Sequence, residues 1–369
     1  MRIAFVHDWL VVNGGAEKVT REILRAYDAD VFALIDFLSA DDRKTILHGK
    51  RARTTFIQHL PFAKRLYRYY LPLFPAAIAR LDLRNYDLII SASYAVAKGV
   101  RTHPGQIHVC YIHTPMRYAW TKEKGYLNDH GLRGPSAWVV RTVLRWLRTW
   151  DLRTNAGVDL FIANSANVAA RVKEFYGRHA EVLLPPVDTE LFQLTEAPRG
   201  HYLSASRLVP YKRVDRVIEA FRMMPDKQLV ITGDGPERDR LERTAPKNVR
   251  FLGHVDQREL VGSMQRAKAL IAAADEDLGL TPLEAQACGT PSIALGKGGY
   301  LETVEDGVSG ILFPDDRPET IAAAVARFEA FPPSSSPAEL RSGMMAYTSE
   351  RFRERFAALV EQAIQQHGR

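Results

Sequence analysis

Residues 267–291 read AKALIAAADEDLGLTPLEAQACGTP and indicate the fold more clearly than any other stretch of the chain. The apolar run at 267–274 is typical of a buried strand, and the segment that follows it predicts a helix. Glu276 therefore comes just after the carboxyl end of a strand. In open α/β sheets that edge is where ligands bind.

The predicted helix start also suits an anionic ligand. Thr281 is placed to cap the helix, Pro282 suits its first position, and Glu284 falls at the third. The N–H groups of a helix N-terminus attract an anion, while the carboxylates of Glu276 and Glu284 can accept hydrogen bonds from hydroxyls. A sugar nucleotide has both a diphosphate and hydroxyls. The same TPLE sequence is also an ordinary capping box, and taken alone it leaves both interpretations open.

The rest of the chain repeats this alternation of short apolar runs and helical patterns, which predicts parallel βαβ units. A linker is expected at 188–199 and a final amphipathic helix at 349–366. Two α/β domains that face each other would form a cleft, a favoured place for a ligand. The expected strands cover 2–8, 30–36, 87–93, 107–113 and 159–165, with 180–188 closing the first half, and then 201–206, 227–233, 249–255, 268–274, 291–296 and 310–314.

Composition narrows the class of protein. The chain has 369 residues, of which 46% are hydrophobic, so it can bury the cores of two domains. Its apolar runs are shorter than the ~20 residues that span a bilayer, and the N-terminus does not read as a signal peptide. Cys110 and Cys288 lie in apolar contexts, which predicts buried free thiols in a reducing cytoplasm.

The net charge of +7 is unevenly distributed. Residues 43–84 contain ten lysines and arginines but a single acid, Asp82, and aromatic residues lie between the bases. Residues 141–153, RTVLRWLRTWDLR, have the same character. Such segments suit an anionic membrane surface or an anionic acceptor, although a solvated basic face is the alternative. No nucleic-acid-binding motif accompanies the charge, so nucleic acid is not an expected partner.

Further motifs follow other predicted strands. Arg207 and Lys212 lie between a strand and a helix in SASRLVPYKRVDRVIEAF, where two cations can neutralise a diphosphate. Gly233 begins the GDGP turn, which by itself is a weak indication. The remaining glycine turns are GKGGYLETV, which holds Gly298 and Gly299, and GGAEKV, which holds Gly14 and Gly15.

In this order and with these gaps, the segments resemble the retaining glycosyltransferases of group 1, which have the GT-B fold. The segments HDWLVVNGGAEKV, CYIHTPMRYAW and LLPPVDTELF resemble a mannosyltransferase-like branch that assembles bacterial O-antigen, capsule and exopolysaccharide. The resemblance implies an α/β protein of two facing Rossmann-like domains. The expected boundaries are an acceptor-side domain at 1–190, a nucleotide-sugar domain at 191–346, and a helix at 347–369 that packs back on the first domain.

The resemblance also implies a role for each matching residue. Arg207 and Lys212 would hold the donor diphosphate, Glu284 the ribose hydroxyls, and Glu276 the donor sugar. His113, at the end of a predicted strand, would face that sugar. The other residues implied in donor binding are Gly14, Gly15, Gly233, Leu280, Thr281, Gly298 and Gly299.

Several residues stay outside this set. His7, Asp8 and Arg117 are weaker candidates for contacts in the cleft. Asp28-Ala29-Asp30 mimics a metal-binding pair, but its position between a helix and a strand predicts a turn, and no metal site is expected. Asp277 and Leu278 stand where the family often has glycine and an aromatic residue, which leaves the contacts beside Glu276 open.

The function implied is transfer of a hexose, with retention, to a lipid-linked oligosaccharide in surface polysaccharide synthesis. GDP-mannose is the first expected donor and UDP-hexose the second, with no cofactor. The enzyme would lie on the cytoplasmic face of the membrane as a peripheral protein. The alternatives are a sugar-nucleotide epimerase, which needs no acceptor, and a non-catalytic nucleotide-sugar-binding protein.

Overall fold

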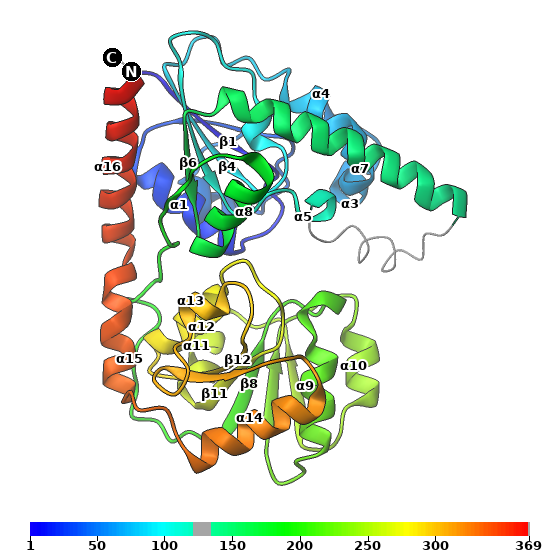
Figure 1. Ribbon diagram of the computed structural model, residues 1–369, viewed down its shortest axis with the longest axis vertical. Coiled ribbons are helices and arrows are strands. Elements are labelled where there is room, and N and C mark those ends of the chain that lie inside the picture. The colour runs from blue at the N-terminus through cyan, green and yellow to red at the C-terminus, as the bar shows by residue number, and fades with distance from the viewer. Residues whose placement is uncertain (121–133, 368–369) are drawn as a thin grey trace. The chain divides into compact units, whose positions relative to one another are not determined.

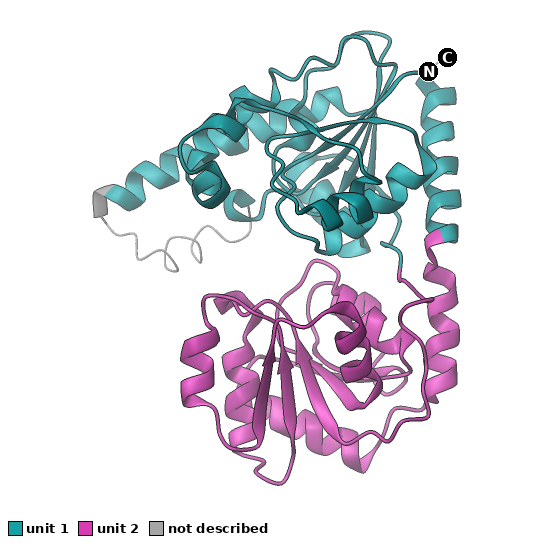
Figure 2. Cartoon of the chain, turned by 180° about the vertical axis from the view of Figure 1, so that it is seen from behind, with its two compact units in different colours: residues 1–186, 350–369 teal, residues 187–349 magenta. Residues whose placement is uncertain are grey.

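The computed structural model describes residues 1–120 and 134–367 of the chain. These residues form two compact units, the first made of 1–186 with 350–369 and the second of 187–349 (Figure 2). Each unit is built on its own parallel β-sheet with helices packed against it (Figure 1). The predicted α/β class, with two Rossmann-like sheets, is confirmed.

The first unit contains a sheet whose described strands are all parallel, in the order β3-β2-β1-β4-β5-β6-β7. The strand order reverses between β1 and β4, and in open α/β sheets such a reversal is where ligands bind. The strands are β1 (Ile3–His7), β2 (Asp30–Ala33), β3 (Arg53–Thr54), β4 (Leu88–Ser93), β5 (Ile107–Ile112), β6 (Leu160–Ala163) and β7 (Glu181–Val182).

Helices cover both faces of this sheet. One apolar core joins α1, α2 and α16 to the sheet, and another joins α4 and α7 with the short 3₁₀ turns. The helices are α1 (Gly15–Ala26), α2 (Ala40–Leu47), α3 (Ala63–Leu66), α4 (Phe74–Ile78), α5 (Arg117–Trp120), α7 (Gly134–Thr154), α8 (Ala166–Tyr176) and α16 (Ser349–His367). The 3₁₀ turns are Phe56–His59, Tyr67–Leu73, Ala97–Gly99 and Asn155–Gly157.

The second unit repeats the architecture with the order β10-β9-β8-β11-β12-β13, again parallel and with its reversal between β8 and β11. Its strands are β8 (His201–Ala205), β9 (Leu229–Thr232), β10 (Val249–Gly253), β11 (Ala267–Ala272), β12 (Ser292–Leu295) and β13 (Gly310–Phe313). Its helices are α9 (Val214–Arg222), α10 (Arg238–Thr244), α11 (Gln257–Gln265), α12 (Leu280–Ala287), α13 (Tyr300–Thr303), α14 (Pro318–Ala330) and α15 (Pro337–Met344), with 3₁₀ turns at Pro210–Lys212 and Met345–Tyr347.

One predicted helix start is wrong. Helix α12 begins at Leu280, and Gly279 is its N-cap with no side chain that caps it. Thr281 therefore lies inside the first turn, and Glu284 lies in the second turn instead of at the third position. The cause is Gly279, whose φ of +85° suits glycine and lets the chain turn into the helix two residues early.

No helix within the two described ranges is both long enough and apolar enough to pass through a lipid bilayer. The longest of them, α7 and α16, each contain several charged residues.

The C-terminal helix α16 packs against the first unit through aromatic rings. Phe356 is fully buried and stacks on Phe352 at 5.9 Å between ring centroids. Its ring also lies 6.1 Å from that of Tyr27 and 6.4 Å from that of Tyr111. At the polar edge of the helix, Arg353 pairs with the buried carboxylate of Glu22 at 2.5 Å.

We expect Phe356→Ala to lower the free energy of unfolding by about 3–5 kcal/mol, because it removes a buried ring and leaves a cavity. The matched control is Phe331→Ala, whose ring is 75% exposed and should change that free energy by less than ~0.5 kcal/mol. Chemical denaturation of both variants measures the difference. Equal effects would show that α16 does not pack on this sheet as described.

Candidate functional site

The reversal of strand order in the second unit brings two loops together. Strands β8 and β11 are neighbours, so the loops at their carboxyl ends emerge side by side (Figure 1). Lys212 ends the 3₁₀ turn after β8, and Glu276 lies in the loop after β11. Their side chains meet, with 2.6 Å between Lys212 Nζ and Glu276 Oε1. The two residues predicted to hold different parts of a donor are thus in direct contact.

A small hollow opens beside this pair, at the carboxyl ends of the same strands. The residues that line it include Lys212, Ser206, Thr281 and Tyr300. Burial, with the charges of Glu276 and Asp275, holds the pKa of Tyr300 well above its ordinary value, so its hydroxyl stays protonated. The lining therefore includes a lysine and residues that carry hydroxyl groups, and such side chains suit phosphate and sugar oxygens.

Arg207 lies in the loop after β8 with its side chain exposed to solvent. The backbone of this loop is held by the loop after β9, because Leu208 N–H donates to Asp234 C=O at 2.9 Å. Gly233 makes the close approach possible, since a Cβ there would lie 1.9 Å from the carbonyl oxygen of Ser206. The predicted site residue Gly233 thus supports the loop that carries Arg207.

The Gly298-Gly299 turn supports Glu276 in the same way. Gly299 N–H donates to the carbonyl oxygen of Glu276 at 2.8 Å. A Cβ on Gly298, whose φ is +58°, would lie 2.4 Å from that same oxygen. These two glycines fix the backbone from which the Glu276 side chain projects.

The start of α12 completes this edge of the sheet. Leu280 and Thr281 are half-buried in its first turn, and Thr281 lines the hollow. Glu284 is 6% exposed and lies one turn further along. The structure therefore brings every predicted residue of the second unit to the carboxyl edge of one sheet.

The predicted residues of the first unit lie at the corresponding edge of its own sheet. Gly14 is the N-cap of α1 and Gly15 its first residue. Gly14 N–H donates to the side chain of Glu17 at 3.0 Å, and burial raises the pKa of Glu17 to about 7. Glu17 was missed from the sequence, although a glutamate three residues after an N-cap is the expected partner of a capping box.

His113 follows β5, and its N–H donates to the carbonyl oxygen of Ser93 at 2.8 Å. Its ring lies 5.1 Å from that of Tyr111 and 6.0 Å from that of Tyr94. Burial lowers the pKa of His113 to about 3, so the imidazole is neutral at neutral pH. A neutral imidazole suits a hydroxyl group better than it suits a phosphate.

Asp8 and His7, which were weaker candidates, are buried at the end of β1. Asp8 accepts hydrogen bonds from four consecutive backbone N–H groups, those of residues 94–97. Its carboxylate therefore anchors the loop after β4. Burial lowers the pKa of His7 to about 4. Arg117, the third weaker candidate, is half-buried at the start of α5.

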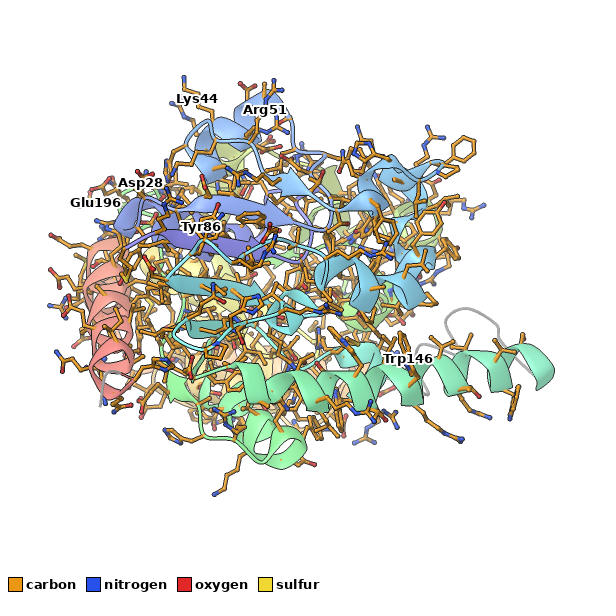
Figure 3. All side chains as sticks on the ribbon, turned by 90° about the horizontal axis from the view of Figure 1, so that it is seen from above. Asp28, Lys44, Arg51, Tyr86, Trp146 and Glu196 are labelled. Atoms are coloured by element: carbon orange, nitrogen blue, oxygen red, sulfur yellow. The ribbon has the colours of Figure 1, made fainter. Side chains whose placement is uncertain are left out.

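The Asp28-Ala29-Asp30 turn connects α1 to β2, and both carboxylates have basic partners. Asp28, labelled in Figure 3, pairs with Lys50, and Asp30 contacts Arg53 at 3.4 Å. Within the described part of the chain, no group of three or more His, Cys, Asp or Glu side chains is placed to hold a metal ion. Cys110 and Cys288 are buried free thiols, and burial raises the pKa of each to about 12.

Two protein-family models match consecutive parts of the chain. The model described as Glycosyltransferase Family 4 matches residues 13–191, and that described as Glycosyl transferases group 1 matches residues 190–346. The second match contains Arg207, Lys212, Glu276 and Glu284.

Curated relatives include glycosyltransferases and mannosyltransferases of several bacteria. A D-inositol 3-phosphate glycosyltransferase of Geodermatophilus obscurus is 34% identical over 204 residues, which are 46% of this chain and 45% of the relative. A Corynebacterium urealyticum enzyme of the same name is 30% identical over 68% of this chain and 64% of its own length. A GDP-mannose-dependent alpha-(1-6)-phosphatidylinositol dimannoside mannosyltransferase of Mycobacterium tuberculosis is 32% identical over 46% of this chain and 41% of the relative. The chain thus matches about half the length of most of these relatives.

Solved structures share the fold at low sequence identity. The HepE protein of Anabaena in complex with UDP has a TM-score of 0.70 and 20% identity, covering 98% of this chain and 100% of its own. Sucrose-phosphate synthase from Thermosynechococcus elongatus has a TM-score of 0.75 and 18% identity, covering 99% and 100%. With its two Rossmann-like sheets and both family models matched in order, the chain belongs to the group 1 glycosyltransferases of GT-B fold.

Proposed function

We propose that this protein is a retaining glycosyltransferase that moves a hexose from a nucleotide sugar to an acceptor hydroxyl. The observation that carries the proposal is the meeting of Lys212 and Glu276 at the strand reversal of the second unit, with Arg207 on the same loop as Lys212. The cationic side chain of Lys212 suits the diphosphate of a sugar nucleotide, and the anionic side chain of Glu276 suits the hydroxyls of its sugar. The hollow beside them is lined in part by residues that carry hydroxyl groups.

The chemical task is to stabilise the negative charge that develops as the nucleoside diphosphate leaves. Arg207 and Lys212 supply fixed positive charge, and the N-terminal N–H groups of α12 add a positive dipole end. Such preorganised groups act on the phosphates without a metal ion. Glu276 would accept hydrogen bonds from hydroxyls of the donor sugar, and Glu284 from the ribose.

Retention needs either a covalent intermediate or attack from the face that the leaving group vacates. A covalent route requires a nucleophilic carboxylate ~5 Å from the acid that protonates the leaving group, as in retaining glycosidases. We infer the front-face route, in which an oxygen of the departing phosphate accepts the proton of the acceptor hydroxyl. In this route the side chains position the donor and stabilise charge, and none forms a bond to the sugar.

GDP-mannose is the first donor that we propose, and a UDP-hexose is the second. Relatives named as GDP-mannose-dependent mannosyltransferases support the first, and a structural neighbour in complex with UDP-glucose supports the second. The proposed acceptor is a lipid-linked oligosaccharide of surface polysaccharide synthesis, reached at the cytoplasmic face of the membrane.

The surface of the first unit supports a membrane-bound acceptor. Phe62 and Tyr69 are each 75% exposed, and Lys64, Arg65 and Arg68 are exposed between them. On α7 the exposed side chains include Trp138 and Trp146, the second of which is labelled in Figure 3. The exposed arginines on α7 are Arg141, Arg145 and Arg153. Exposed aromatic residues with bases favour the interface of an anionic bilayer.

We expect Arg207→Ala to reduce sugar transfer about 10²–10³-fold, because it removes one of the positive charges that stabilise the leaving diphosphate. The protein should stay folded, because the side chain of Arg207 is exposed. The matched control is Arg222→Ala, at the last residue of α9 and so at the far end of that helix from Lys212. Radiolabelled transfer assays with circular dichroism compare the two. Wild-type rates in Arg207→Ala would remove Arg207 from the site.

Because side chains and helix amides supply the positive charge, we expect transfer to continue at an unchanged rate after dialysis against EDTA. The assay compares initial rates in EDTA with rates after added Mg²⁺ or Mn²⁺. Activity that is lost with EDTA and restored by one of these cations would contradict the metal-independent mechanism.

We expect the protein to float with vesicles that contain anionic phosphatidylglycerol at low salt, and to stay unbound to neutral phosphatidylcholine. Phe62→Ser should weaken this binding, whereas Phe331→Ser, equally exposed but in the second unit, should not. No binding of the wild-type protein to anionic vesicles at low salt would rule out the membrane part of the proposal.

Product analysis separates this proposal from the other two classes of protein. An epimerase would convert a sugar nucleotide in the absence of any acceptor, and a non-catalytic binding protein would bind the donor without turnover. A glycosyltransferase instead releases nucleoside diphosphate in step with acceptor glycosylation, and NMR of the new glycosidic bond reports whether the configuration is retained.

A further inference from the structure

The close contact of Lys212 with Glu276 has a consequence for which ligands the site accepts. The two side chains are 22% and 16% exposed, and 2.6 Å separates the ammonium nitrogen from the nearer carboxylate oxygen. In the proposed reaction they hold different parts of the donor, the phosphate and the sugar. In this structure they hold each other.

The distance makes this contact an ion pair, but the angles at the two groups are not those of a hydrogen bond. Among the described residues, Glu276 Oε1 is buried and has no hydrogen-bond partner of acceptable geometry. A buried carboxylate oxygen that lacks a directed donor is stabilised mainly by the nearby positive charge. A ligand hydroxyl could supply the missing hydrogen bond.

Hydrogen bonds constrain the backbone at both Lys212 and Glu276. When a ligand replaces one member of the ion pair, the side chains must therefore move and the backbone stays in place. The carbonyl oxygen of Glu276 is held by Gly299 N–H at 2.8 Å. Lys212 N–H donates to the carbonyl oxygen of Val209 at 3.0 Å, and the next residue, Arg213, has a φ of +56°.

A diphosphate and Glu276 compete for the same ammonium group. If a bare nucleoside diphosphate takes Lys212, the carboxylate of Glu276 loses its counter-charge and stays partly buried beside the phosphates, which is unfavourable. An intact sugar nucleotide also takes Lys212, but its sugar hydroxyls can donate to Glu276. The intact donor therefore replaces both partners of the ion pair, whereas the product replaces one.

We propose that the Lys212–Glu276 ion pair makes the site favour an intact sugar nucleotide over the nucleoside diphosphate product. The inference rests on the proposed function, and it gives Glu276 a second role in releasing the product. Once the sugar has left, Glu276 regains Lys212 and weakens the hold on the diphosphate.

The test is Glu276→Gln, which keeps the size and hydrogen-bonding groups of the side chain but removes its charge. Isothermal titration calorimetry would use two pairs of ligands, GDP with GDP-mannose and UDP with UDP-glucose. We expect the nucleoside diphosphate that the wild-type protein recognises to bind roughly two- to fivefold more tightly to the variant, the size expected for releasing a partly shielded ion pair. The intact donor should gain nothing or bind more weakly.

Two further variants separate the ion pair from a general charge effect. Asp277→Asn removes the same charge from the same loop, and we expect it to leave the ratio of the two affinities unchanged. In a Lys212→Met background, Glu276→Gln should no longer tighten nucleoside diphosphate binding, because the ammonium that it would release is gone. This double-mutant cycle isolates the coupling between the two side chains.

The proposal is overturned if Glu276→Gln tightens both ligands equally or neither, if Asp277→Asn reproduces its effect, or if the tightening persists without Lys212. A different result bears on the function itself. If neither the wild-type protein nor Glu276→Gln binds any of the four ligands, the nucleotide-sugar site is wrong, whereas wild-type binding with an unchanged ratio in Glu276→Gln removes only the ion-pair inference.

Discussion

The reversal of strand order in each parallel sheet is the constraint on which the rest of the structure depends. In the second unit the reversal between β8 and β11 places Lys212 and Glu276 on adjacent loops, although they lie far apart in the sequence. In the first unit the reversal between β1 and β4 places the loop after β1, which holds Gly14, beside the loop after β4, and β5, which His113 follows, is the next strand in the sheet. Because parallel strands share one carboxyl edge, every chemically informative loop of a unit emerges on the same side of its sheet.

Close packing between loops turns that edge into a defined site. Gly233 allows the loop after β9 to lie against the backbone beside Arg207. Gly298 and Gly299 allow the loop after β12 to lie against the backbone at Glu276 and just after it. In the first unit the carboxylate of Asp8 ties down four amides of the loop after β4. Several residues that a motif would assign to the ligand thus act on the loops. A side chain added at Gly233 or Gly298 would collide with the backbone of Ser206 or Glu276 and so displace the loop that carries a candidate residue.

The sequence was sufficient for most of the fold, because buried parallel strands appear as short apolar runs between helical patterns. It missed β3, since Arg53–Thr54 is too short to form a pattern. It misplaced the start of α12, because the TPLE motif suggested a cap at Thr281 while the positive φ of Gly279 lets the helix begin earlier.

Sequence motifs named the candidate residues, and the structure brings those of the second unit to one edge of its sheet, but the contacts among these residues could not be predicted. Nothing in the sequence shows that Lys212 and Glu276 touch, because the contact depends on how two loops pack and on the rotamers of both side chains. The role of Asp8 was hidden for the same reason, since its hydrogen-bond partners lie more than eighty residues away. Motifs indicate which functional groups are present, whereas the packing of the loops decides which of these groups are already paired with each other.

The central claim is that the carboxyl edge of the β8–β11 sheet binds a nucleoside diphosphate. Its most direct test is calorimetric titration of the wild-type protein and Lys212→Ala with GDP, UDP, ADP and dTDP. The account predicts a clear preference of the wild-type protein for one of the four and a marked loss of that binding in Lys212→Ala. No binding by the wild-type protein, or equal binding by the variant, would contradict it.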